Sequence, residues 1–298
     1  MPLFHFLRNV QTVRGVDFSG AALAGQNAWL ATLDVTANVN AVPDLSGPRK
    51  TAAEKTKEQK NTQQLAGLRL TDLAPLERAA GDARRDTVMR WLVSQITAPE
   101  SGPVLWAMDF PFSFPTDLGL GSWDEQLRWI ADSENPNVSD AKTCGRYLVD
   151  RCRERSGTGH VKRETDRISK TPFDSHHYRI IYQTFHGMRD VLGPLRQKSP
   201  GVCVLPFDYQ RLNNQTRVVV VESCPSSTLK RFGLPHHRYK SSGGKTPTPQ
   251  HRQTRQTILR HVTQHVSFSQ HRRGVMMKNP GGDALDAVLA GYGAWSAM

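Results

Sequence analysis

The chain has 298 residues, enough to bury a full hydrophobic core as one elaborated domain or two small ones. It carries 39 Lys and Arg against 27 Asp and Glu, so its formal net charge is +12 and it favours polyanionic partners, with nucleic acid foremost. No apolar run reaches the roughly 18 residues of a membrane span, and the apolar N-terminus is too short for a secretory signal, so we expect a cytoplasmic protein with no membrane partner.

Three strands are predicted in the first quarter of the chain. Residues 12–18 and 28–35 have the apolar content of half-buried or buried strands, and residues 68–73 form a short third strand. Between the second and third strands, residues 38–65 are mostly polar and include a Lys-rich run, which is typical of a long connecting loop.

A helix, a fourth strand and a helical insertion follow. Apolar residues between Leu76 and Ile96 keep approximately helical spacing, and residues 104–109 form a strand that ends before Pro111. Residues 123–200 are predicted to contain two or three helices, the clearest of which begins near Asp174. The apolar face of that helix comprises Tyr178, Ile181, Phe185, Met188 and Leu192.

The last third of the chain completes the predicted sheet. Residues 202–205 make a short extended piece, and the continuous Val run at 217–222 is typical of a strand buried on both faces. A basic insertion over 226–280 precedes a final helix. Strand, strand, strand, helix, strand, helix, strand, helix is the order of the RNase H-like fold. We therefore predict an α/β protein, with one RNase H-like domain over 1–298 and a central mixed sheet flanked by helices.

Carboxylates stand where these strands end and where the last helix begins. Asp17, Asp109 and Glu222 close three strands, and Asp283 and Asp286 are three residues apart at the helix start. Because the ends of neighbouring strands lie about 5 Å apart and residues i and i+3 share a helix face, we expect the five acids to converge. Such convergence is costly without a cation, and carboxylates are ligands that Mg²⁺ prefers.

The predicted site therefore holds Mg²⁺ or Mn²⁺. Two such ions about 4 Å apart can activate a water and stabilise the leaving oxygen of a phosphodiester. In this hypothesis Asp17 bridges the two ions, and Asp109 and Asp286 complete their ligand shells. Glu222 and Asp283 are secondary ligands or orienting groups.

Each acid also has a simpler interpretation. Asp283 could cap the final helix, with Asp286 complementing the helix dipole. Glu222 could be the partner of a nearby Arg, and Asp109 could accept turn hydrogen bonds before Pro111. The metal-site hypothesis therefore depends on finding the carboxylates in one place.

The motifs around these acids resemble those of domain-of-unknown-function family 429. They read Gly-Val-Asp17-Phe-Ser-Gly, Asp109-Phe-Pro-Phe, Glu222-Ser-Cys-Pro-Ser and Asp283-Ala-Leu-Asp286-Ala, with Thr171-Pro-Phe and Gln183-Thr-Phe-His-Gly-Met-Arg189 resembling the middle motifs. The family is described as predicted nucleases with an RNase H-like fold, and the last motif is similar to the closing helix of RuvC-like resolvases, where paired acids hold metal. One departure is Glu222-Ser-Cys-Pro, where the family more often has a Tyr.

Basic residues are candidates for contacting phosphates. From Ser223 to Gly282 the chain has eleven Lys or Arg and six His but no Asp or Glu. This stretch is either a solvated insertion or a surface that follows a phosphate backbone. A second basic group over 142–170 is diluted by acids. The residues predicted to bind nucleic acid are Arg163, Lys170, Arg189, Arg252, Arg255, Arg272 and Arg273.

The leading functional hypothesis is a metal-dependent nuclease that cuts a phosphodiester by in-line attack of a metal-bound water. Two alternatives stay open: a nucleic-acid- or partner-binding module that keeps the fold without cleaving, and an actin-like nucleotide hydrolase. The nucleotide hydrolase requires a second Gly-rich phosphate loop after a later strand, and the sequence contains no convincing one. Whether the substrate is DNA or RNA is open, as are protein partners.

The remaining histidines and cysteines are predicted to be structural. His176-His177 and His236-His237 lack the spaced Cys or His partners of a zinc site, so we expect core or surface histidines. The four cysteines show no Cys-x-x-Cys spacing and are expected to be reduced thiols.

Overall fold

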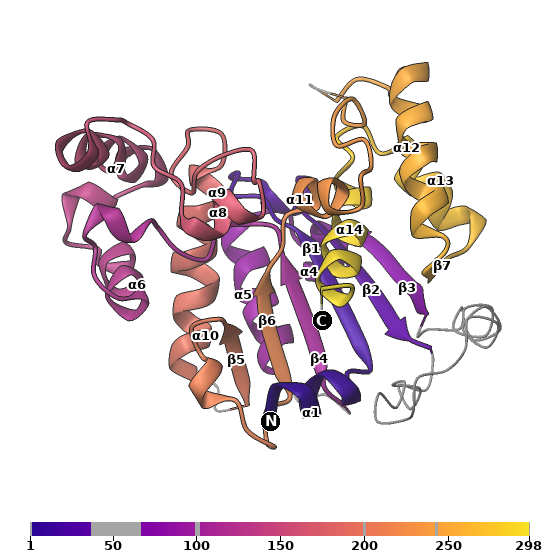
Figure 1. Cartoon of the computed structure of the whole chain (residues 1–298), viewed down its shortest axis with the longest axis horizontal. Coiled ribbons are helices and arrows are strands. Elements are labelled where there is room, and N and C mark those ends of the chain that lie inside the picture. The colour runs from indigo at the N-terminus through magenta and orange to yellow at the C-terminus, as the bar shows by residue number, and fades with distance from the viewer. Residues whose placement is uncertain (1, 37–66, 99–101, 199–200, 242–243, 298) are drawn as a thin grey trace, which may run out of the picture.

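A seven-stranded mixed sheet lies at the centre of the computed structural model, with helices on both faces (Figure 1). The structure describes residues 2–36, 67–98, 102–198, 201–241 and 244–297. The polar loop predicted at 38–65 lies outside these residues. None of the described helices combines the length and apolarity needed to cross a membrane.

The sheet order is β5-β6-β4-β1-β2-β3-β7, and β2 runs antiparallel to both of its neighbours while the other neighbouring pairs are parallel. The strands are β1 (Thr12–Asp17), β2 (Trp29–Val35), β3 (Leu68–Pro75), β4 (Val104–Met108), β5 (Val202–Leu205), β6 (Val218–Glu222) and β7 (Val266–Ser267). The expected fold class, an α/β structure built on a mixed sheet with flanking helices, is confirmed.

One face of the sheet is covered by the early helices and by the helical insertion. Side chains from these elements share a hydrophobic cluster with Val16, Trp106 and Val220 of the sheet. The elements are α2 (Ala24–Asn27), α4 (Leu76–Ala80), α5 (Arg85–Thr97), α6 (Trp123–Ala131), α7 (Ala141–Ser156), α9 (Ile181–His186), the π-helical segment η3 (Gly187–Leu192) and α10 (Gly193–Lys198). The short helix α8 (Glu164–Ile168) lies between α7 and α9.

The opposite face is covered by α1 (Pro2–Asn9) and by the C-terminal helices. Their apolar side chains pack on Val13, Leu105 and Val219, the alternate residues of the same strands, as the two-residue period of a strand requires. The C-terminal helices are α11 (Pro225–Arg231), α12 (Pro249–Val262), α13 (Gln270–Lys278) and α14 (Asp283–Trp295). Figure 1 shows α14 lying across the middle of the sheet and α12 and α13 beside its β3 edge.

The helix α14 approaches β1 unusually closely because two glycines face each other. A side chain at Gly15 would overlap the Ala287 carbonyl oxygen and the Gly291 backbone nitrogen, and a side chain at Gly291 would meet the backbone of Gly15. Only residues without a Cβ permit this approach. It brings the first turn of α14 against the end of β1.

Two predicted helices begin or end elsewhere than the sequence indicates. The segment from Leu76 is divided into α4 and α5 because Gly81 adopts a left-handed conformation with φ of 73°. The helix predicted from Asp174 begins at Ile181, since the Asp174 carboxylate accepts a hydrogen bond from the His176 backbone at 3.2 Å and holds a turn. Tyr178, placed on the buried face by its spacing, is 70% exposed.

Candidate functional site

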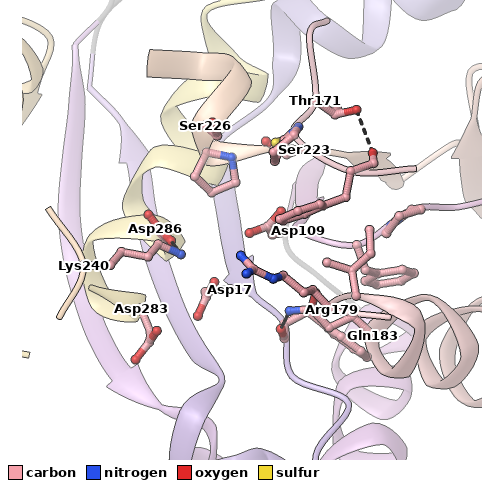
Figure 2. Close-up of a pocket in the computed structure, with 18 of the residues that line it drawn as sticks. Asp17, Asp109, Thr171, Arg179, Gln183, Ser223, Ser226, Lys240, Asp283 and Asp286 are labelled. Atoms are coloured by element: carbon pink, nitrogen blue, oxygen red, sulfur yellow. Dashed lines mark hydrogen bonds and ion pairs between the residues drawn. The ribbon is translucent and has the colours of Figure 1, made fainter. Parts of the chain in front are cut away.

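Three carboxylates meet where β1 and β4 end and α14 begins. Asp17 is the last residue of β1, Asp109 follows β4, and Asp286 lies in the first turn of α14. One oxygen atom from each lies within 4.8 Å of the others. Figure 2 shows the three side chains, with Asp283 beside them, around one open space.

The strand register explains why Asp17 and Asp109 share this space. Val16 pairs with Met108 in the parallel β1–β4 ladder, so the next residues, Asp17 and Asp109, follow side by side. Both lie on the face that α14 covers, because Val13 and Leu105, four residues earlier on each strand, belong to the cluster on that face. The close packing of α14 on Gly15 then brings Asp286 to the same point.

Burial makes negative charge costly at this point. Asp17 is 7% exposed and Asp286 is fully buried. Loss of hydration, followed by the charge of Asp286, raises the pKa of Asp17 well above its usual range. The same two causes raise the pKa of Asp109 to about 8. The cluster therefore needs protons or a cation near neutral pH.

A lysine and a tyrosine from the basic insertion hold Asp286. The Tyr239 hydroxyl donates a hydrogen bond to Oδ1 at 2.9 Å, and the Lys240 ammonium forms an ion pair with Oδ2. Burial opposes the charge on Lys240, but the Asp286 carboxylate raises its pKa well above the usual range, so the ammonium stays charged. The sequence analysis did not predict that Tyr239 and Lys240 contact the carboxylates. The one signal for such a contact was the stretch without Asp or Glu that contains both residues.

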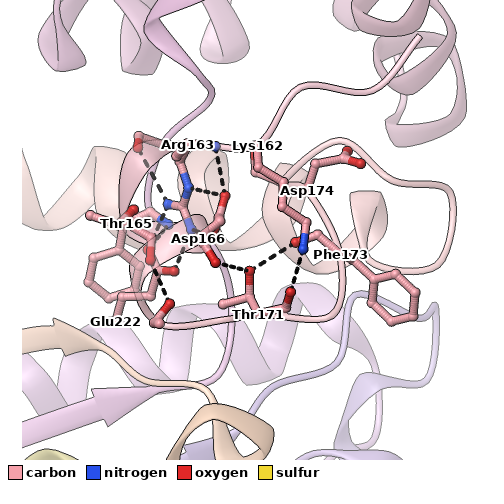
Figure 3. Close-up of polar contacts among 12 residues, drawn as sticks. Lys162, Arg163, Thr165, Asp166, Thr171, Phe173, Asp174 and Glu222 are labelled. Carbon is pink, nitrogen blue, oxygen red and sulfur yellow. Dashed lines mark hydrogen bonds and ion pairs between the residues drawn. The ribbon is translucent and has the colours of Figure 1, made fainter. Parts of the chain in front are cut away.

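Glu222 lines the same cleft as the other acids but is not part of the group of three carboxylates within 4.8 Å. Glu222 pairs with Met108 and not with Asp109 in the β4–β6 ladder, so its side chain points to the opposite face of the sheet. There Arg163 donates to Glu222 Oε1 at 2.5 Å and to Oε2 at 2.8 Å (Figure 3). Oε2 also accepts from the backbone of Phe112 at 2.9 Å. The contacts support the simpler interpretation of Glu222 as the partner of an arginine.

Asp283 lines the same cleft as the three carboxylates but is not part of the group within 4.8 Å. It is the first residue of α14, and the preceding residue, Gly282, occupies the cap position without a side-chain hydrogen bond. Asp283 is therefore not the helix cap considered above. Burial, followed by the charge of Asp286, raises its pKa against the opposing effect of Lys240.

Two insertions form the walls of the cleft, which has a volume of about 610 Å³. The loop before α9 contributes Thr171, Phe173 and Arg179, and the turn after α11 contributes residues 236–240. In Figure 2, Lys240 and Gln183 lie on opposite sides of Asp17. Gln183 donates a hydrogen bond to the Phe18 carbonyl at 2.5 Å, which fixes this wall to the end of β1.

Among the residues predicted to bind nucleic acid, two arginines are buried. Arg255 is fully buried, so the prediction that it contacts nucleic acid is wrong. Its guanidinium donates to the five carbonyl oxygens of Tyr239, Met276, Met277, Asn279 and Pro280. Arg163 lines the cleft but is 8% exposed, and its guanidinium is engaged by Asp166 and Glu222.

The other predicted residues do not line the cleft. Arg189 pairs with Asp190 at 2.7 Å and lies over the Phe185 ring. Arg272 donates to the Thr71 carbonyl and joins α13 to β3. Lys170 and Arg252 are exposed, and Arg273 is partly exposed. Lys170 also accepts, through its carbonyl, a hydrogen bond from Lys230 at 2.5 Å, which links the two walls.

The fold and site together define an α/β protein with a carboxylate cluster in a cleft at the strand ends. The family described as protein of unknown function (DUF429) matches residues 15–298, so the chain belongs to this family. No curated protein and no solved structure matches the chain. The middle motifs that carried the resemblance contribute Thr171 and Gln183 to the cleft.

Proposed function

We propose that the protein is a metal-dependent nuclease whose centre is formed by Asp17, Asp109 and Asp286. The observation that supports this most is the convergence of three carboxylate oxygens within 4.8 Å at the base of a basic-walled cleft. Hydrolysis of a phosphodiester by such a centre requires a divalent cation held by oxygen ligands. The proposed cation is Mg²⁺ or Mn²⁺.

The residues present fit such a cation. All three donors are carboxylates, the hard oxygen ligands that suit Mg²⁺ and Mn²⁺. Among the described residues, Oδ2 of Asp286 is a fully buried atom with no hydrogen bond and only the ion pair with Lys240. Three mutually repelling carboxylates with one lysine leave negative charge that a metal would neutralise. When bound, the metal would activate water and stabilise the leaving oxygen.

Lys240 limits how many cations the centre can hold as it stands. Its ammonium pairs with one of the two Asp286 oxygens, while Tyr239 occupies the other. A second ion bridged by Asp17, as predicted from the sequence, would be repelled by the nearby ammonium, so Lys240 would have to move away from Asp286. With Lys240 in place, the proposal is one metal ion next to a fixed ammonium, which can contact a substrate phosphate instead of the second metal.

The walls of the cleft supply the groups that would bind the nucleic-acid backbone. Arg179 on one side and Arg238 on the other are exposed and line the cleft together with His236 and His237. Positive side chains on two sides of an acidic centre suit a polynucleotide, in which neighbouring phosphates flank the phosphodiester to be cut on both sides. The net charge of +12 agrees with a polyanionic substrate.

The test is a cleavage panel of single- and double-stranded DNA and RNA with Mg²⁺, Mn²⁺ or EDTA. Asp17→Asn should lower divalent-dependent cleavage by more than about 100-fold, since even outer groups of metal sites contribute 10–100-fold. The matched control is Asp86→Asn, an exposed acid on α5 that should cleave like the parent. An Asp17→Asn protein that cleaves at the parental rate would remove the centre from the mechanism.

The panel also distinguishes the two alternative functions. A protein that shifts nucleic acid but cleaves none of the substrates with either metal would be a binding module on this fold. Release of phosphate from ATP or GTP, lost in Asp17→Asn, would indicate the actin-like nucleotide hydrolase.

The cytoplasmic location expected from the sequence also stays a prediction.

A further inference from the structure

A second cluster of metal-ligating side chains lies outside the carboxylate centre. His160 comes from the loop after α7, and Asp174 and His176 come from the turn before α9. His160 Nδ1 is 3.0 Å from Asp174 Oδ2, and His176 Nδ1 is 3.3 Å from Asp174 Oδ1. One donor atom from each of the three residues lies within 4.8 Å of the others.

One ring nitrogen of the buried His176 has hydrogen-bond partners, and the other has none among the described residues. Its side chain is fully buried, and among the described residues Nδ1 has no hydrogen-bond partner although it faces the Asp174 carboxylate. Its other nitrogen, Nε2, is 3.3 Å from the Gly159 carbonyl oxygen. A proton on Nε2 suits that carbonyl, and it leaves the Nδ1 lone pair directed at a carboxylate with nothing positive between them.

A cation between His176 Nδ1 and the Asp174 carboxylate would give this lone pair a partner. A histidine that ligates metal through one nitrogen usually donates its other N–H to a carbonyl or carboxylate, the role that Gly159 fills here. Donors about 2.0–2.2 Å from a tetrahedral zinc ion lie about 3.3–3.5 Å from each other. His160 lies 3.0 Å from one oxygen of Asp174 and His176 lies 3.3 Å from the other, so an ion held between the two rings by both carboxylate oxygens would keep each ring at about this spacing.

We propose that His160, Asp174 and His176 form a binding site for a divalent transition metal such as Zn²⁺. Two imidazoles with one carboxylate favour this class of metal over Mg²⁺, which prefers oxygen ligands. The His160 side chain is 52% exposed, so the ion has a path from solvent and a water can complete its ligand shell. The site is separate from the carboxylate centre and does not depend on the proposed nuclease activity.

The ion would fix one wall of the cleft. The loop that carries His160 continues into Arg163, whose guanidinium reaches Glu222 on β6. The segment before Asp174 contains Thr171 and Phe173, which line the cleft, and Lys162 donates to the Thr171 carbonyl at 2.6 Å (Figure 3). A metal that joins His160 to Asp174 would therefore cross-link the two loops on which this wall is built.

Cys152 offers a different explanation that the test must separate. Its Sγ is 3.3 Å from Nε2 of His176, so a thiol proton donated to Nε2 would place the ring proton on Nδ1, toward Asp174. In that case the residues form a hydrogen-bonded chain and need no metal. Cys152 is 1% exposed, which leaves it out of reach of a substrate as a nucleophile.

The experiment measures metal content and zinc affinity of the full chain, in the Asp17→Asn background so that the carboxylate centre does not contribute. After Zn²⁺ loading and gel filtration, elemental analysis should find about one zinc per chain, and zinc should raise the melting temperature. His160→Gln, at a half-exposed position that folding tolerates, should weaken zinc binding by more than about 100-fold, as should Asp174→Asn. His271→Gln, an exposed histidine on α13, is the matched control and should bind like its parent.

Cobalt distinguishes the ligand set. Co²⁺ in this site should give visible absorption of a four- or five-coordinate ion without a thiolate charge-transfer band, because Cys152 lies on the Nε2 side of the ring. The proposal is overturned if no zinc is retained, if His160→Gln binds zinc like the parent, or if a thiolate band appears. Since no readout involves cleavage, an inactive protein that binds zinc would contradict the proposed function and leave this site intact.

Discussion

The two insertions that form the cleft walls neutralise their positive charge in different ways. In the helical insertion, arginines pair with carboxylates, as Arg163 does with Asp166 at 2.7 Å and Arg196 with Asp208 at 2.7 Å. The basic insertion has no acid between Ser223 and Gly282, and its buried arginine, Arg255, donates instead to five backbone carbonyls.

This difference shows that an excess of basic residues along a sequence is not the same as a basic surface. Four of the five carbonyls that Arg255 satisfies lie at and beyond the end of α13, where a helix leaves acceptors unpaired, and the fifth belongs to Tyr239. The carboxylate that this insertion does contact lies outside it: Lys240 pairs with Asp286 of the centre. The basic insertion thus supplies both Arg255, which donates to backbone carbonyls, and Lys240, whose positive charge balances Asp286 at the carboxylate centre.

The largest effect on stability is expected at Arg255. Arg255→Ala removes the donor from five buried or partly buried carbonyls and leaves a cavity, so the free energy of unfolding should fall by more than about 4 kcal/mol. Urea denaturation measures this change. Arg252→Ala, three residues earlier and exposed, should be indistinguishable from the parent. Equal stability of both variants would show that the carbonyl contacts contribute nothing.

A smaller loss is expected when the ion pair of the opposite wall is broken. Arg163→Ala leaves Asp166 buried and Glu222 partly buried without their cation, which should cost about 3 kcal/mol in urea denaturation. Arg167→Ala breaks an exposed pair with Glu164 in the same segment and should change stability little. If the two variants lose the same stability, burial of the Arg163 pair is not what stabilises this wall.

The carboxylate centre between the walls should make metal-free stability depend on pH. Because the folded pKa values of Asp17 and Asp109 are raised, the native state binds more protons than the unfolded state above about pH 4. The contribution of these two groups to the free energy of unfolding should therefore fall as pH rises from about 4 through about 8, the folded pKa of Asp109.

Thermal melts of the EDTA-treated protein across this range test the pH dependence. Asp17→Asn should flatten it and match or exceed the parent in stability near pH 8, because the substitution removes a repelling charge. Saturating Mn²⁺ should also flatten it. A metal-free parent whose pH dependence equals that of Asp17→Asn would contradict the raised pKa values.

The smallest effect concerns exposed or partly exposed basic residues of α12 and α13, which do not line the cleft. Replacing Arg252 and Arg273 by Ala should reduce the slope of log K against log salt for duplex binding by at most about 1.8, since each phosphate contact contributes about 0.9. Binding to all sequences should weaken alike. Arg90→Ala, exposed on α5, is the control. An unchanged slope in the double variant would show that these two arginines do not contact the backbone.

The sequence by itself determined much of the sheet and the positions of the acids. Strands were predicted within a few residues of β1, β2, β3, β4 and β6 because apolar runs and turn residues are local signals. The final helix was predicted from residue 283, where it begins. Strand ends also placed Asp17 and Asp109 correctly, because parallel neighbouring strands end at one edge of a sheet.

Only the tertiary structure decided which side chains meet. Glu222 is not in the group of three carboxylates because ladder register decides which face of the sheet a side chain lies on. A continuous Val run hides the alternation of inward and outward side chains from which that face could be predicted. Lys240 reaches Asp286, and His160 reaches Asp174, across 46 and 14 residues of chain. Arg255 is buried because distant carbonyls surround it. Such contacts are set by the packing of whole elements, for which residue type and local spacing carry no signal.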